Sequence, residues 1–158
     1  MVICLIFPIW AFCKIYRNFD KLEDDDFKET YGSLYEDLKT NCLVCSMYHM
    51  IFLGRRFTIV MLLMFAEENK MLQVMSFLIL SLVNLGVLII YKPFKEKSSN
   101  NIEIMNECTV YLCNTATYCI MNDGTDEEFR TEMGDQLMNI CILNMVINLG
   151  IVMYGTVN

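Results

Sequence analysis

Proline, glycine and histidine are scarce in this chain. Its 158 residues include two prolines, seven glycines and one histidine. So few turn-forming residues argue against a loop-rich fold, and the sequence has no internal repeat of fixed period. It lacks a glycine-rich phosphate loop and a Gly-x-Ser-x-Gly motif, and only His49 could serve as a base for a nucleophile. We therefore expect a protein that is not an enzyme and that has no catalytic residue and no cofactor.

Eight cysteines are present, but their positions do not suit a secreted disulfide scaffold, whose cysteines lie in loops. All eight lie in or beside apolar segments: Cys4, Cys13, Cys42, Cys45, Cys108, Cys113, Cys119 and Cys141. Cys42, Cys45 and His49 share one face of a predicted helix, as metal ligands would. Structural zinc usually takes four ligands, however, and no second pair is present. We expect no metal site.

The run from Met71 to Tyr91 contains 21 residues and no charged side chain. A helix rises about 1.5 Å per residue, so this run is long enough to cross a hydrocarbon core about 30 Å thick. Charged residues flank it at both ends, and 55% of the whole chain is hydrophobic. The run therefore predicts a membrane-spanning helix and a protein whose main partner is the lipid bilayer.

The hydrophobic pattern predicts an all-α, polytopic transmembrane helix bundle at 42–154. Its four spans cover residues 42–66, 71–91, 102–121 and 136–154. An apolar segment at 1–16 is either a partial helix whose start is missing or an inefficient anchor. Residues 17–41 form an acidic linker, in which Leu34, Tyr35 and Leu38 predict a short helix at the membrane interface. Residues 155–158 form a tail.

Positive charge is distributed unevenly over the loops. Most lysines fall in 17–41 and 92–101, whereas 67–70 and 122–135 hold only Lys70 and Arg130. The positive-inside rule therefore places the first two loops and the tail in the cytoplasm, and the other two loops outside, most simply at the plasma membrane. The net charge of −7 comes from acidic clusters in loops and argues against a nucleic-acid partner.

Arg55 and Arg56 interrupt the predicted span at 42–66, where a charge at mid-membrane costs at least about 2.5 kcal/mol. Two interpretations remain open. In one, residues 42–54 lie along the cytoplasmic interface, Gly54 permits a bend, and the arginines reach the headgroups. In the other, the arginines face the bundle interior and pair with acidic side chains.

Glu103 and Glu107 are the acidic candidates, since they are four residues apart on one face of the 102–121 segment. Glu103 lies near the cytoplasmic end. Glu107 lies more than a turn deeper and is the better partner for Arg55 or Arg56. The preferred interpretation is that Glu107 is part of a structural ion pair, and the alternative is that it is a cation or proton site.

Several asparagines fall within the spans. The candidate polar residues are Asn84, Asn106, Asn114, Asn144 and Asn148. Amide side chains in lipid usually join helices through hydrogen bonds worth about 0.6–2 kcal/mol each. The alternative is that they line a polar path through the membrane.

A set of short motifs occurs in a fixed order from residue 31 to residue 154. They are Tyr31 to Glu36 (YGSLYE), Arg55-Arg56-Phe57, Gln73, Pro93-Phe94, Asn101, Asn106-Glu107, and Thr125-Asp126 followed by Arg130 and Gly134. In these residues the chain resembles the multi-helix membrane region of transient-receptor-potential-like proteins of the fungal and protist type. It is most similar to the C-terminal part of large ciliate surface proteins.

The resemblance implies a membrane domain of a channel-like or receptor-like surface protein, which conducts cations as part of a longer chain or an oligomer. Its other partners would be further membrane helices, from an upstream segment or from copies of this chain. No selectivity-filter sequence is recognisable. The alternative is a non-conducting anchor for an extracellular region, or a small subunit of a membrane complex.

Overall fold

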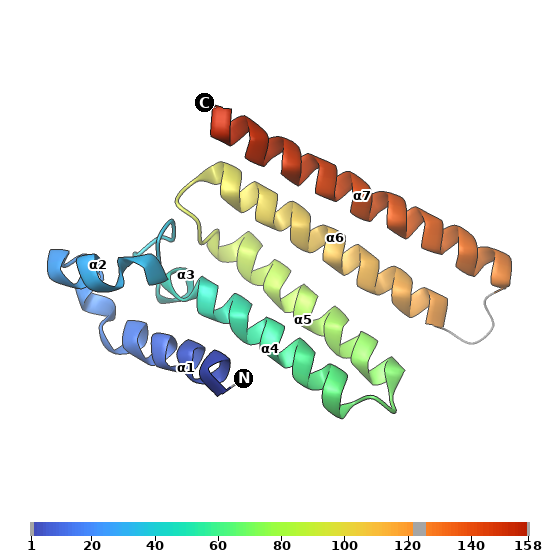
Figure 1. Cartoon of the computed structure of the whole chain (residues 1–158), viewed down its shortest axis with the longest axis horizontal. Coiled ribbons are helices and arrows are strands. Elements are labelled where there is room, and N and C mark those ends of the chain that lie inside the picture. The colour runs from blue at the N-terminus through green and yellow to red at the C-terminus, as the bar shows by residue number, and fades with distance from the viewer. Residues whose placement is uncertain (1, 122–125, 158) are drawn as a thin grey trace. The chain divides into compact units, whose positions relative to one another are not determined.

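The computed structural model describes residues 2–121 and 126–157, without the side chains of 2–6, 8 and 155–157. The described part is mostly helical and contains no strand longer than an isolated bridge. Its α-helices are α1 (Val2–Arg17), α2 (Asp25–Tyr31), α3 (Leu43–Ser46), α4 (Tyr48–Phe65), α5 (Lys70–Tyr91), α6 (Lys97–Met121) and α7 (Glu127–Val157), with short 3-10 turns at Phe19–Lys21 and Gly32–Leu34 (Figure 1). The predicted all-α class is confirmed.

Three helices in the described part are long and apolar enough to cross a membrane. They are α4, α5 and the Glu127–Tyr154 part of α7. The predicted span at 102–121 is helical as part of α6 but is not among the three, because its first turns carry amides and carboxylates such as Asn101, Glu103 and Asn106. The N-terminal segment forms α1, and its 16 residues are fewer than the 18 that a candidate membrane span needs.

The short helix of the linker lies earlier in the sequence than predicted. The α2 helix covers Asp25–Tyr31, and its first turn carries Asp25 and Asp26, whose charge complements the helix dipole. Tyr35 instead lies in a bend after it, and Leu38 forms an isolated bridge with Phe94; both side chains are buried. The Tyr35 hydroxyl donates a hydrogen bond to the Leu22 carbonyl at 2.9 Å, and burial raises the pKa of this phenol.

Three other boundaries differ from the prediction. The predicted span at 42–66 is divided at Met47, between α3 and α4, whereas Gly54 lies inside α4 without ending it. The predicted span at 102–121 is part of a longer helix, because α6 already begins at Lys97 within the predicted loop 92–101. The acidic loop predicted at 122–135 is helical from Glu127, where acidic residues occupy the first turn of α7. Residues 122–125 of that loop, including Thr125, lie outside the described part.

The chain divides into two compact units. Unit 1 comprises Met1–Phe65 and Val87–Asn100, and unit 2 comprises Ala66–Gly86 and Asn101–Asn158. In unit 1, α1 packs against α4, and Ala11 and Ile15 of α1 are fully buried. In unit 2, α6 lies between α5 and α7 (Figure 1).

A set of hydrogen bonds in unit 1 joins the linker to the turn between α5 and α6, and we call it the linker clasp. The Lys39 amide donates to the Pro93 carbonyl at 2.8 Å, and the Lys95 amide donates to the Asp37 carbonyl at 2.9 Å. The Lys39 ammonium reaches the Lys92 carbonyl at 2.6 Å. The two loops predicted to be cytoplasmic are therefore fixed to each other by main-chain bonds.

Backbone strain is concentrated in the linker clasp. Among the described residues other than glycine, only Asp37 (φ 63°) and Lys92 (φ 45°) have positive φ. A left-handed conformation costs an L-residue about 1–2 kcal/mol. We expect Lys92→Gly to stabilise the fold by about 0.5–1 kcal/mol, after the entropy cost of glycine is subtracted. Denaturant titration checks this, and Lys95→Gly, which relieves no such strain, should give no gain.

Candidate functional site

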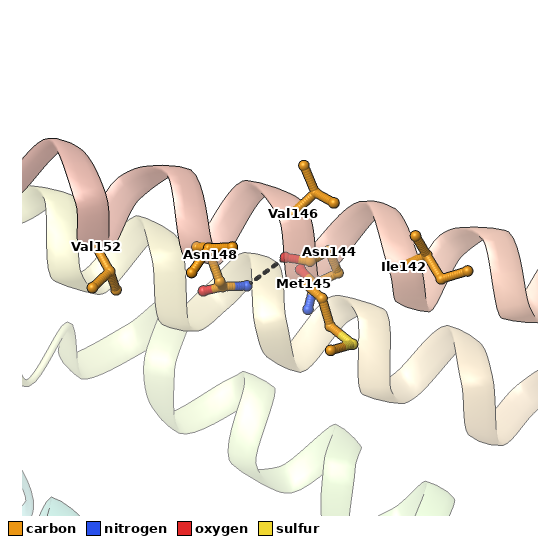
Figure 2. Close-up of a pocket in the computed structure, with 7 residues that line it drawn as sticks. Ile142, Asn144, Met145, Val146, Asn148 and Val152 are labelled. Carbon is orange, nitrogen blue, oxygen red and sulfur yellow. Dashed lines mark hydrogen bonds between the residues drawn. The ribbon is translucent and has the colours of Figure 1, made fainter.

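Unit 2 contains an amide pair that joins α6 to α7. Asn106 donates to the Asn148 side-chain oxygen at 3.2 Å, and Asn148 donates back to the Asn106 oxygen at 2.7 Å. The Asn148 amide also donates to the Asn144 main-chain carbonyl at 2.8 Å, one turn away on α7 (Figure 2). Three of the five predicted polar residues are thus brought together, because the i, i+4 spacing of Asn144 and Asn148 places both near α6.

A second polar contact joins α5 to α6. Asn114 donates to the Ser81 hydroxyl at 3.1 Å, and Ser81 is buried. Sequence reasoning missed Ser81, since serine is common in apolar helices. The available signal was its spacing from Asn84, because residues three apart share one helical face. Polar contacts therefore connect all three long helices of unit 2.

Asn84 differs from the other asparagines. Its side chain is 3% exposed, and within the described part of the chain neither its Oδ1 nor its Nδ2 atom has a hydrogen-bond partner. Asn144 Oδ1 is also buried without a partner there. A buried polar atom left unsatisfied costs about 1–3 kcal/mol. Asn84 therefore offers one donor group and one acceptor in a mostly apolar span, which suits a water molecule or a polar solute better than it suits packing.

The charged candidates lie in different units. Glu107 is on α6 in unit 2 and is 3% exposed, while Glu103 on the same helix is half-buried. Arg55 and Arg56 are on α4 in unit 1, where their guanidinium carbons lie 5.7 Å and 4.8 Å from the centre of the Phe52 ring. These distances allow cation–π attraction, which lowers the cost of holding an arginine in an apolar helix. The pairing of arginine with Glu107 stays a prediction.

An apolar groove of about 570 Å³ runs along α7. Its lining is Ile142, Asn144, Met145, Val146, Asn148, Leu149 and Val152 (Figure 2). The apolar side chains of this set are mostly exposed on the surface of α7. Because this stretch of α7 is long and apolar enough to span a membrane, lipid chains are the expected contents of the groove.

Two cysteines form a further contact between α6 and α7. The Cys113 and Cys141 sulfur atoms are 3.5 Å apart, and both thiols are free. Within the described residues, no three histidine, cysteine, aspartate or glutamate side chains gather as a metal site would require. The predicted shared face of Cys42, Cys45 and His49 is wrong, because α3 ends at Ser46 and His49 belongs to α4.

Replacing Asn148 with leucine tests the amide pair. The change leaves both groups of the Asn106 amide without their partner, so we expect a loss of about 1–2 kcal/mol in the free energy of unfolding. Asn139→Leu on the exposed face of α7 is the matched control and should change this free energy by less than about 0.5 kcal/mol. Unfolding in mixed micelles, followed by circular dichroism, measures both. Equal effects would contradict the pairing.

The comparisons with known proteins agree with this picture of a helical membrane protein. The sequence model of the family described as transient receptor potential (TRP) ion channel matches residues 1–156. No curated protein and no solved structure matches the chain. The family match covers nearly the whole sequence and includes the three described helices that are long and apolar enough to cross a membrane. This integral membrane chain therefore belongs to the TRP ion channel family.

Proposed function

We propose that the chain is the membrane domain of a channel-like or receptor-like surface protein of fungal or protist type, and that it conducts cations as part of a longer chain or an oligomer. The family membership supports a channel-like domain. The buried side chain of Asn84, which has no hydrogen-bond partner among the described residues, is the single observation that favours conduction. An amide oxygen replaces part of the hydration shell of a cation.

The other polar contacts of unit 2 have a supporting role in this proposal. The Asn106–Asn148 pair and the Asn114–Ser81 contact hold α5, α6 and α7 together. They leave Asn84 one turn away from Ser81 on the same helix. A buried carboxylate at Glu107 needs a cationic partner, and Arg55 and Arg56 are the cations available within the predicted spans. This pair sets the packing of the bundle.

The proposed location is the plasma membrane, with 17–41 and 92–101 in the cytoplasm and 67–70 and 122–135 outside. The linker clasp supports part of this arrangement, since loops that bond to each other must lie on one side of the bilayer. An Asn-x-Thr acceptor inserted after Arg130 should be glycosylated in cells, whereas one inserted after Lys97 should not. The reverse result would show that the chain has the opposite orientation in the membrane.

The second candidate function is a non-conducting anchor for an extracellular region, or a small subunit of a membrane complex. The observation that favours it is the satisfied state of the Asn106, Asn114 and Asn148 amides, which act as contacts between helices. In this reading Asn84 only binds a buried water molecule.

Current recordings from cells that express the complete protein separate the two functions. An immunoblot first gives the size of the native protein. A band at 18.5 kDa would mean that the segment at 1–16 and the four predicted spans act alone or as an oligomer. We expect Asn84→Ala to change the cation current at an unchanged surface level, and Asn139→Ala to leave it unchanged. Normal surface assembly without any current would favour the anchor.

A further inference from the structure

A polar pocket lies in unit 1, beside the linker clasp. Its volume is about 410 Å³, within the range of about 300–1,000 Å³ that small-ligand sites usually have. Its lining comes from the last turn of α2, from the residues that follow α2 and from one residue beyond the end of α5: Lys28, Gly32, Ser33, Tyr35, Glu36, Asp37 and Lys95. All of these residues belong to unit 1. Unlike the groove along α7, this pocket is surrounded by charged side chains.

Main-chain hydrogen bonds hold the walls of this pocket in place. The Gly32 amide donates to the Lys28 carbonyl at the end of α2, and the Tyr35 amide donates to the Gly32 carbonyl at 3.1 Å. The Lys95 amide donates to the Asp37 carbonyl at 2.9 Å and so joins the two segments that form the pocket. The Tyr35 ring is buried, and its hydroxyl already donates to a main-chain carbonyl. The backbone is therefore ordered before a ligand binds, which lowers the entropy cost of binding.

The pocket carries two positive and two negative side chains. Lys28 and Lys95 supply the positive charges, and Glu36 and Asp37 supply the negative ones. In the described part of the chain, no ion pair or side-chain hydrogen bond joins either lysine to either carboxylate. All four side chains are exposed, so a ligand can reach them. Balanced but separate charges complement a ligand that carries one phosphate and one ammonium group, and they disfavour a ligand with charge of one sign only.

We propose that this pocket binds the phosphoethanolamine headgroup of a phosphatidylethanolamine lipid. Lys28 and Lys95 donate charge-assisted hydrogen bonds to the phosphate, while Glu36 and Asp37 accept hydrogen bonds from the ammonium group. A lipid is the favoured source of this group because of the position of the pocket. Lys95 follows Tyr91, the last residue of the α5 candidate span, by only four positions, and the headgroup layer begins where a span ends.

The ammonium end of the headgroup decides which lipid is preferred. A primary ammonium group can donate three hydrogen bonds, whereas the quaternary ammonium group of choline has no N–H to donate. The headgroup of phosphatidylglycerol carries no cation, so it leaves Glu36 and Asp37 without a partner and is repelled by them. The pocket should therefore retain phosphatidylethanolamine in preference to both phosphatidylcholine and phosphatidylglycerol.

Native mass spectrometry of the full chain, purified in mixed micelles, counts the lipids that stay bound. Each sample contains one of the three lipids at the same concentration and with identical acyl chains. We expect one tightly held phosphatidylethanolamine per chain and about tenfold weaker binding of the other two lipids, as the loss of a charge-assisted hydrogen bond predicts. Equal retention of the three lipids, or strongest retention of phosphatidylglycerol, would overturn the proposal.

Variants that remove one charge assign the two ends of the headgroup. Lys95→Gln keeps the main-chain bond of this residue and should weaken phosphatidylethanolamine binding about tenfold. Asp37→Asn, which tolerates the left-handed backbone at φ 63°, should weaken the binding of phosphatidylethanolamine but not of phosphatidylcholine. Glu96→Gln and Lys97→Gln change charges that do not line the pocket and should leave binding unchanged. Equal losses in these controls would show that general surface charge, and not the pocket, holds the lipid. The lipid preference of the wild type remains a test if a variant misfolds.

Free phosphoethanolamine distinguishes a lipid from a soluble ligand of the same chemistry. Acyl chains add apolar contacts that the free compound lacks, so it should displace the bound lipid only at about a hundredfold excess or more. Displacement at equal concentration would show that the pocket takes a soluble ligand and would overturn the assignment to a lipid.

Discussion

Replacing Glu107 with glutamine is expected to destabilise the folded chain by about 3–5 kcal/mol, the usual cost of breaking a buried ion pair. The carboxylate is 3% exposed on α6, so it is kept from solvent in the folded chain. Glutamine keeps the shape of the side chain but removes its charge, which leaves the proposed cationic partner, Arg55 or Arg56, uncompensated in the membrane. Unfolding of the purified protein in mixed micelles, followed by circular dichroism, measures the loss.

Glu103→Gln is the matched control for this experiment. It makes the same chemical change four residues earlier on the same helix, at a half-buried position near the predicted cytoplasmic end, and should cost less than about 1 kcal/mol. Arg55→Gln and Arg56→Gln, each combined with Glu107→Gln, identify the partner. The double variant that contains the true partner should be more stable than the sum of its single effects predicts. Normal stability of Glu107→Gln with altered conduction would instead make Glu107 a cation or proton site.

The second large effect is expected for Tyr48→Ala, in the interior of unit 1. Tyr48 is 1% exposed, and its ring lies edge-on to the Phe94 ring, with 5.4 Å between the ring centres and 73° between their planes. Removal of a buried aromatic side chain typically costs about 3–5 kcal/mol, because a cavity replaces its contacts. Since Phe94 lies between Pro93 and Lys95, whose main-chain groups bond in the linker clasp, the change should also release the turn between α5 and α6 from the linker.

Thermal unfolding and hydrogen exchange of the Lys39 and Lys95 amides measure these two effects. Both amides donate main-chain hydrogen bonds in the linker clasp and should exchange faster in Tyr48→Ala. Tyr48→Phe keeps the ring and should retain most of the stability. Tyr16→Ala removes a tyrosine that is 60% exposed and should cost less than about 0.5 kcal/mol. Unchanged amide exchange in Tyr48→Ala would show that the ring pair does not hold the clasp.

The sequence by itself determined the helical class, the membrane environment and most of the polar candidates. In the hydrocarbon core of a membrane, water cannot satisfy the main-chain polar groups of a long uncharged run. A helix satisfies them within the segment itself. The spacing of Asn144 and Asn148 placed them on one face, and in the structure Asn148 bonds both to Asn106 of α6 and to the Asn144 carbonyl one turn away. These are consequences of local geometry, which the order of residues fixes.

Only the tertiary structure decided which partners the polar residues have. No local pattern predicts that Asn106 pairs with Asn148 or that Asn114 meets Ser81, since these contacts join residues 42 and 33 positions apart. The same holds for the left-handed backbone at Lys92, which the clasp imposes, and for the turn that replaced a predicted helix at Tyr35. Tyr35 and Leu38 have an amphipathic helical spacing, but burial against distant segments stabilised a different local structure, because packing outweighs weak helical preference.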